Sequence, residues 1–353
     1  MARLRSNRRR NRMLSRGLIG VLAVACVLFV LHFFNPLGTT EAAEAGAGDG
    51  TEFIPAPEAG NDWVEAPKAE PAATPTPAVA ETPAKAEPKA QPRTLAKPGF
   101  LKDAKALVDG GKLLEARTVL NDALQTGTLD RATSELTKSQ LRELNNVIVY
   151  TPTKRFADDP FQSTYTVAGG DTLGKIARNL DVPYQFVARV NAVKPTAIRV
   201  GQSLKIVNGP IHAVVSKKHF TMDLYLGALP GQPGSMYLTT FDVGLGADGS
   251  TPTGIWEVTR GSKLVNPEWT NPRTNEVFGR DDPKNPLGER WIGLTGIAGD
   301  AVGQPSYGIH GTIFPETVGT NASMGCIRLR DADIEAVYDM LSEGKSTVRV
   351  TAD

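Results

Sequence analysis

The chain has 353 residues, enough for two or three domains of ordinary size. Lysine and arginine total 39 against 38 aspartate and glutamate, so the net charge is +1, and seven of the arginines fall within residues 1–16. The basic charge is one terminal block rather than a nucleic-acid-binding face, so we predict no nucleic-acid partner. Two cysteines and four histidines exclude a disulfide-rich scaffold and a four-cysteine zinc site, and we expect no metal or organic cofactor.

The basic segment 1–16 runs directly into an apolar stretch at residues 17–36, in which residues 17–34 carry no charge. This length is near the minimum for a helix that crosses a membrane. Arginines on the N-terminal side place that end in the cytoplasm. We predict a single-pass anchor in the cell inner membrane, with the rest of the chain in the periplasm or cell wall space. A cleaved signal peptide, cut near residues 43–45, is the alternative.

Residues 37–98 are rich in proline and alanine, with ten Pro and twelve Ala between residues 51 and 100. Glu, Lys and Thr are interleaved with them, so the segment has too little apolar surface to offset the entropy lost on ordering. We predict a disordered tether, which lets the domains after it search a layer above the membrane.

Apolar residues recur at helical spacing within residues 99–150, in two segments separated by Gly110 and Gly111 and followed by a third helix. The pattern resembles a tetratricopeptide-type helical hairpin, of which a single copy is visible. Because such repeats are normally stable only in arrays of about three or more, we predict a packing or spacer module. A module that binds a protein partner is the alternative.

Residues 163–208 follow a β-α-α-β order, with Asp171 expected to cap the first helix. This segment resembles the LysM domain in its motifs YTV, GDTL, IA, VN and GQSLKI. The resemblance implies binding to the N-acetylglucosamine glycan strands of peptidoglycan or chitin. The resemblance places the glycan groove between the first turn, at Gly170, Asp171 and Thr172, and the loop at residues 193–198 before the last strand.

Short β-like runs fill residues 211–352 and one helix is expected at 331–341, which predicts a mainly β domain with a capping helix. Cys326 is the one cysteine outside the apolar stretch, and His310 precedes it by sixteen residues. A thiol with a pKa of about 8.5 needs an adjacent base or cation to act as a nucleophile. A histidine titrates in the range that suits this base. The amides of Gly325 and Cys326 could hold a developing oxyanion.

The sequence around these two residues resembles the active-site signature of the YkuD-type L,D-transpeptidases. The resemblance covers 211–350 and rests on four blocks, Thr251–Gly254, Asn285–Gly293, His310–Thr312 and Ser323–Arg328. It implies a β-sandwich with a capping helix. Met324 departs from the pattern, since many members carry histidine or another basic residue there. His310 is then the only base near the thiol.

The resemblance implies that Cys326 attacks a tetrapeptide stem of peptidoglycan and expels its terminal D-Ala. The thioester is then resolved by a side-chain amine of a neighbouring stem, giving a 3-3 cross-link. His310 acts as general base, oriented by a backbone carbonyl, while Ser323 makes hydrogen bonds within the site and Arg328 orients the loop or meets a substrate carboxylate. Substrate binding is assigned to three further residues, Gly311, Thr312 and Met324.

Three other functions remain open at the level of the sequence. Water could resolve the same thioester, which would make the protein an L,D-carboxypeptidase. A protein amine could resolve it, which would attach a protein to the wall. A non-catalytic scaffold that binds the wall through LysM alone is the third alternative, and an intact pair of Cys326 and His310 argues against it.

Overall fold

The computed structural model describes residues 95–353. The predicted basic segment (1–16), the predicted anchor (17–36) and nearly all of the predicted tether (37–98) lie outside the described residues. Within 95–353, none of the helices combines the length and the apolar character that crossing a membrane requires. The membrane anchor therefore stays a prediction from the sequence.

Helices form the region predicted at 99–150, namely α2 (Phe100–Asp109), α3 (Leu113–Gln125) and α4 (Arg131–Ile148). Gly111 follows α2 with a φ of 76°, a left-handed conformation that glycine adopts readily and that turns the chain into α3. Asp130 begins α4 as its N-cap, because its Oδ1 accepts a hydrogen bond from the amide of Thr133 at 2.9 Å. The helical spacing and the glycine pair thus predicted this region correctly.

The β-α-α-β order predicted for the LysM segment is confirmed by β1 (Gln162–Thr166), α5 (Leu173–Ala177), α6 (Tyr184–Asn191) and β2 (Ser203–Val207). The prediction that Asp171 caps α5 is wrong, because Thr172 is the N-cap and its Oγ1 accepts from the amide of Lys175 at 3.2 Å. Asp171 lies one residue too early. Its carboxylate closes the preceding turn, accepting from the amide of Ala168 and from the hydroxyl of Tyr165.

The β-α-α-β unit is joined to the helices by Lys205, a lysine on β2 that is completely buried. Its Nζ donates hydrogen bonds to the carbonyls of Ile148, Val149 and Thr151, at and just after the end of α4. Burial lowers the pKa of Lys205 to about 8, with the charge of Arg155 acting in the same direction. The amine therefore remains mostly protonated at neutral pH and can donate all three hydrogen bonds.

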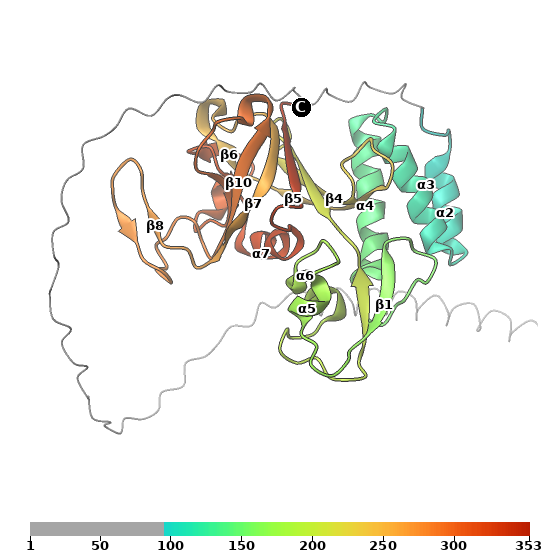
Figure 1. Ribbon diagram of the computed structural model, residues 1–353. Coiled ribbons are helices and arrows are strands. Elements are labelled where there is room, and N and C mark those ends of the chain that lie inside the picture. The colour runs from blue at the N-terminus through green and yellow to red at the C-terminus, as the bar shows by residue number, and fades with distance from the viewer. Residues whose placement is uncertain (1–94) are drawn as a thin grey trace, which may run out of the picture. The chain divides into compact units, whose positions relative to one another are not determined.

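Residues 211–351 form one eight-stranded sheet (Figure 1). In spatial order its strands are β13 (Ile327–Arg328), β11 (Tyr307–His310), β10 (Arg290–Ala298), β7 (Gly254–Val265), β14 (Thr347–Thr351), β3 (Ile211–Ser216), β4 (Thr221–Gly227) and β5 (Ser235–Asp242). Two small sheets accompany it, β6 (Leu245–Gly246) with β12 (Asn321–Ser323) and β8 (Trp269–Thr270) with β9 (Val277–Phe278). Short 3-10 turns occupy Ala247–Gly249, Gly299–Ala301 and Pro315–Thr317.

The domain is mainly β with a capping helix, as predicted, but it is not a sandwich of two separate sheets. The C-terminal strand β14 pairs in parallel with β3 and antiparallel with β7, and so joins the two halves into one continuous sheet. Register shifts in the β7–β10 and β4–β5 pairs add the twist that curls it. The capping helix is α7 (Asp331–Met340), which buries Ile334 and Val337 and contacts β10.

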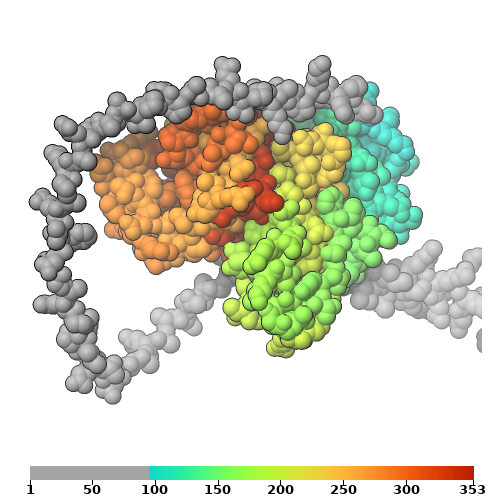
Figure 2. Space-filling model, viewed as in Figure 1, coloured from blue at the N-terminus to red at the C-terminus, as the bar shows by residue number. Residues whose placement is uncertain are grey.

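Helices α3 and α4 cover the outer edge of β5, the last strand of the large sheet. Asn121 donates to the carbonyl of Ser235 and accepts from the amide of Tyr237. Asn145 donates to the carbonyl of Tyr237 and also to that of Leu238. These side-chain amides satisfy backbone groups that an exposed edge strand would leave open to another chain. On the face seen in Figure 2, the yellow atoms around β5 adjoin the blue-green helices.

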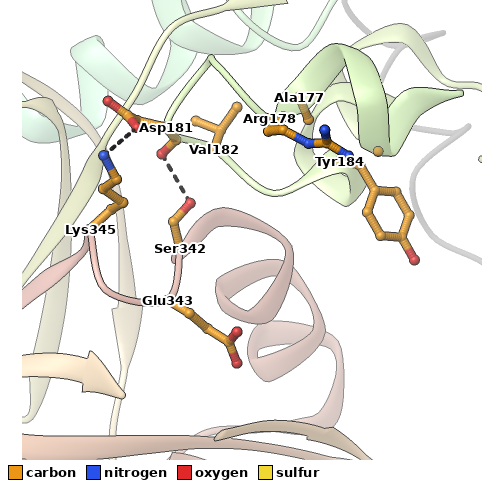
Figure 3. Close-up of a pocket in the computed structure, with 9 residues that line it drawn as sticks. Ala177, Arg178, Asp181, Val182, Tyr184, Ser342, Glu343 and Lys345 are labelled. Carbon is orange, nitrogen blue, oxygen red and sulfur yellow. Dashed lines mark hydrogen bonds and ion pairs between the residues drawn. The ribbon is translucent and has the colours of Figure 1, made fainter. Parts of the chain in front are cut away.

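The β-α-α-β unit also contacts the loop that follows α7, around a small cleft of about 270 Å³ (Figure 3). Asp181 is the central residue of this junction. Its carbonyl accepts from the hydroxyl of Ser342 at 2.9 Å, and its carboxylate pairs with Lys345 at 3.0 Å. Nearby, the guanidinium of Arg189 pairs with Asp339 of α7 at 2.7 Å. The two domains are thus joined by polar contacts in addition to the covalent connection at residues 208–210.

Lys205→Met provides a test of the contact between LysM and the helices. Methionine keeps the apolar stem but leaves three buried carbonyls without their donor, so we expect the free energy of unfolding of residues 95–353 to fall by about 2–4 kcal/mol. Urea unfolding followed by circular dichroism measures the change. The control is Lys175→Met, whose exposed amine donates to the carbonyl of Gly170 in the same domain. A loss for Lys205→Met no larger than for this control would contradict the structural role of Lys205.

Candidate active site

Parallel pairing of β11 with β13 brings the two candidate catalytic segments together. Ile309 pairs with Ile327, and His310 pairs with Arg328. Side chains alternate between the faces of a strand. Ile309 and Ile327 are therefore buried in the core, while His310 and Arg328 share the opposite face, and Cys326 precedes β13 on that same side.

The imidazole of His310 is held by a tryptophan and a backbone carbonyl. Trp291 is the cross-strand partner of His310 on β10, and the two rings stack with centroids 5.8 Å apart and planes 20° apart. The same indole lies so close to Gly308 that a Cβ there would come within 2.5 Å of it. The Nδ1 of His310 donates to the carbonyl of Gly311 at 2.6 Å. Since a carbonyl only accepts, the proton is on Nδ1, and the lone pair of the neutral ring is on Nε2.

Burial sets the charge state of this pair. His310 is only 3% exposed, and burial lowers its pKa to about 4, with Arg328 acting in the same direction and the carbonyl of Gly311 opposing it. Burial also raises the pKa of the Cys326 thiol, against the effects of the Gly308 amide and of Arg328. At neutral pH the site therefore contains a neutral thiol and a neutral imidazole, rather than an ion pair. The S–H of Cys326 points to the carbonyl of Ser306 at 3.8 Å.

A tight turn at residues 323–326 presents the thiol. The hydroxyl of Ser323 donates to the carbonyl of Cys326 at 2.6 Å and accepts from the amide of Gly325 at 3.0 Å. Ser323 therefore makes the hydrogen bonds within the site that the sequence predicted. The expectation that both amides face an oxyanion is wrong for Gly325, because its N–H is already used by Ser323. The amide of Cys326 is the remaining donor.

These side chains line a cavity of about 660 Å³. Its wall contains five of the predicted catalytic and substrate-binding side chains together with a set that the sequence analysis had not assigned. The predicted ones are Cys326, His310, Ser323, Arg328 and Met324, and the unassigned ones include Trp269, Thr270, Ser306 and Tyr307. The hairpin β8–β9 contributes Trp269, whose ring stacks on Phe278 of the same hairpin at 5.8 Å.

Arg328 places a positive charge in this cavity. Burial lowers the pKa of Arg328, and the proximity of Cys326 raises it because the guanidinium lies beside the thiol. Its buried Nε has no hydrogen-bond partner among the described residues. A buried donor without a partner is costly. The guanidinium is a cation on the cavity wall that lies beside the thiol.

The other predicted substrate-binding residues lie away from the cavity wall. Gly311 is buried and supplies the carbonyl that holds His310, and Thr312 is buried with its hydroxyl accepting from the amide of Phe314. Gly170, Asp171 and Thr172 form the turn before α5 in the LysM domain. The structure thus describes two separate candidate sites, a catalytic cavity and a LysM turn.

Some wall residues could have been found from the sequence. Trp291 lies within the Asn285–Gly293 block that signalled the family, although its position beside His310 follows only from strand pairing. Trp269 and Ser306 belong to connections with no recognisable motif. Among residues 95–353, no group of three or more histidine, cysteine or acidic side chains is arranged to hold a metal ion.

Comparison with known proteins agrees with this geometry. Residues 211–350 match the family described as the L,D-transpeptidase catalytic domain (YkuD), and residues 165–207 match the LysM domain. The YkuD protein of Bacillus subtilis (strain 168) is 25% identical over 189 residues, which cover 51% of this chain and 94% of that protein. The probable L,D-transpeptidase YcfS of Escherichia coli (strain K12) is 30% identical over 197 residues, which cover 50% of this chain and 57% of that protein.

Similarity to solved structures is partial. An L,D-transpeptidase from Mycobacterium smegmatis is 15% identical, with a TM-score of 0.30 and coverage of 44% of this chain and 65% of that one. Among the relatives compared by sequence, the chain spans nearly all of the Bacillus protein but little more than half of the Escherichia protein. Residues 211–350 are an L,D-transpeptidase catalytic domain of the YkuD family, preceded by a LysM domain at 165–207.

The low pKa of His310 predicts an unusual pH profile. The unprotonated ring is the form that can accept a proton, so acylation of Cys326 by an activated ester should be lost only as the pH falls through about 4. Trp291→Ala admits water to the ring and should raise the pH at which the acylation rate falls, towards the ordinary histidine pKa of about 6.5. The measurement is the rate of adduct formation by intact mass at each pH. Trp269→Ala, which lines the cavity without stacking on His310, is the control. A wild-type acylation rate that already falls near pH 6.5 would contradict the conclusion that burial lowers the pKa of His310.

Proposed function

We propose that this protein is a peptidoglycan L,D-transpeptidase that forms 3-3 cross-links through a thioester on Cys326. The observation that carries the proposal is the hydrogen bond from Nδ1 of His310 to the carbonyl of Gly311. It leaves the Nε2 lone pair as the basic atom in a cavity that also contains the thiol. A cysteine and an oriented histidine in one cavity are the requirements for acyl transfer through a thioester.

In the first step, Sγ of Cys326 attacks the carbonyl that precedes the terminal D-Ala of a tetrapeptide stem. Because both groups are neutral at rest, the thiol proton passes to Nε2 of His310 as the C–S bond forms. The oxyanion that develops accepts a hydrogen bond from the amide of Cys326. When the tetrahedral intermediate collapses, the C–N bond breaks and the leaving amine of D-Ala takes the proton from His310.

In the second step, a side-chain amine of a neighbouring stem attacks the thioester. His310 accepts a proton from that amine and returns it to the sulfur as the C–S bond breaks, which restores the resting thiol. Arg328 lines the same cavity as the thiol, and we propose that its guanidinium meets a carboxylate of one of the two stems. Met324, on the cavity wall and 37% exposed, contributes an apolar contact without proton transfer.

The LysM domain supports a wall substrate independently of the catalytic cavity. We propose that its turn at Gly170, Asp171 and Thr172 contributes to binding glycan strands. The contacts of Asp181 and Arg189 with the catalytic domain would then connect glycan binding with the cavity that takes the stems. Binding to one polymer through two linked sites raises the effective concentration of the second ligand. We further propose that residues 17–36 anchor the chain in the inner membrane, facing the wall from within.

Acylation of the purified protein tests the assigned roles. With a tetrapeptide-stem donor or a carbapenem, wild type should gain one covalent adduct, and Cys326→Ala should gain none. His310→Ala should slow adduct formation by about 10²–10⁴-fold, the usual contribution of a positioned base. Met324→Ala is the matched control on the same loop and should react nearly as fast as wild type. Intact-mass spectrometry over a time course measures all four. An adduct on Cys326→Ala, or an unchanged rate for His310→Ala, would overturn these roles.

Analysis of the wall in cells identifies the acceptor. Deletion of the gene should lower the fraction of 3-3 cross-linked stems, and wild type but not Cys326→Ala should restore it. Enzymatic digestion of the wall and mass analysis of the fragments measure this fraction. Unchanged cross-links with a rise in tetrapeptide stems would indicate the carboxypeptidase instead. Loss of a wall-linked protein alone would indicate protein attachment.

A further inference from the structure

A buried threonine outside the cavity wall connects the nucleophile turn to a neighbouring segment. Thr251 is 2% exposed and follows the turn after β6. Its Oγ1 accepts a hydrogen bond from the amide of Gly246 at 2.8 Å and lies 2.8 Å from the carbonyl oxygen of Gly325. The amide of Gly246 can only donate and the carbonyl of Gly325 can only accept. The single hydroxyl proton of Thr251 is therefore donated to Gly325.

This hydrogen bond determines the direction of the oxyanion donor. The carbonyl of Gly325 and the amide of Cys326 belong to the same planar trans peptide unit, so they point in opposite directions. With its carbonyl held at Thr251, the peptide unit directs the N–H of Cys326 away from Thr251. In the part of the chain that the structure describes, no acceptor takes this N–H, and Cys326 lines the cavity.

The peptide unit needs such a restraint because it follows a glycine. Gly325 has a φ of 131°, a region that other residues rarely adopt, and a Cβ there would lie 2.7 Å from the ring of Tyr307. Glycine is required for this close approach, but glycine also makes rotation of the adjoining peptide unit inexpensive. Tyr307 supports the same region by donating from its hydroxyl to the carbonyl of Ser250 at 2.8 Å. Of these contacts, only the one from Thr251 holds the Gly325 carbonyl.

We propose that Thr251 is a positioning residue for acyl transfer, which acts by aligning the Cys326 amide with the developing oxyanion. The inference rests on the proposed function, because it assumes that a carbonyl is attacked in this cavity. An aligned amide stabilises the oxyanion of the transition state more than the carbonyl of the bound substrate. Loss of the Thr251 hydroxyl should therefore lower the maximal acylation rate with little effect on the half-saturating donor concentration.

Two reactions of the same thiol distinguish a variant with a misaligned Cys326 amide from a variant with a less reactive thiol. Acylation by a stem donor or by p-nitrophenyl acetate develops an oxyanion, whereas alkylation by iodoacetamide displaces iodide at a saturated carbon and develops none. In the full-length protein, Thr251→Val should lower the maximal acylation rate by about 10–100-fold, less than the loss of a whole oxyanion donor. Its alkylation rate should stay within about threefold of wild type, because the thiol and His310 are unchanged.

Further variants control for side effects. Thr251→Ser keeps the hydroxyl and should restore most of the acylation rate, while Thr251→Ala is a second hydroxyl deletion with a smaller side chain. Thr137→Val removes another fully buried hydroxyl, one that donates to Thr133 within α4, and should leave both rates unchanged. Thermal unfolding confirms that each variant is folded.

The outcomes are distinguishable. Equal acylation rates for Thr251→Val and wild type would overturn the inference. So would an equal slowing of acylation and alkylation, or a Thr251→Ser variant as slow as Thr251→Val. If the stem donor fails to acylate every variant, wild type included, the proposed function fails. The comparison with p-nitrophenyl acetate then still tests Thr251, because every acyl transfer to the thiol passes through an oxyanion.

Discussion

The parallel pairing of β11 with β13 is the constraint on which the site depends. Two residue pairs, Ile309 with Ile327 and His310 with Arg328, align segments that are separated in the chain by a connection with little regular structure. Burial of the two isoleucines in the core anchors the pairing. Alternation along each strand then puts His310, Arg328 and the adjoining Cys326 on the cavity face. Apolar packing on one face of the sheet therefore maintains the polar arrangement on the other.

The same burial controls the reactivity of the thiol. A cysteine paired with a protonated histidine is a thiolate at rest and is readily oxidised or alkylated. Here burial lowers the pKa of His310 to about 4 and raises that of Cys326, so the resting pair is neutral. In the proposed reaction, proton transfer to His310 therefore accompanies attack of the thiol on the substrate. In the reaction we propose, such a site keeps the thiol unreactive at rest and relies on fixed backbone donors when the substrate is attacked.

The domains before the catalytic sheet are integrated with it by buried polar contacts. Lys205 joins LysM to the end of α4, and Asn121 and Asn145 cover the edge of β5. Arg117 and Asp159 form an ion pair that is nearly inaccessible to solvent. Removing one partner of such contacts leaves the other unsatisfied, so they favour one arrangement of the segments. These contacts support the packing role predicted for residues 99–150.

The sequence by itself determined that a LysM domain precedes the catalytic domain, the three helices of residues 99–150, the β-α-α-β unit and the identity of Cys326 and His310 as candidates. Those features depend on local periodicity, on turn residues and on motifs that are contiguous in the chain. Only the tertiary structure decided that β14 joins both halves of the sheet, that Trp291 covers His310, and that Thr251 holds the Gly325 carbonyl. Each of these contacts joins residues that are far apart in the chain. Pairing and burial between two distant segments leave no periodic signal in the sequence of either segment.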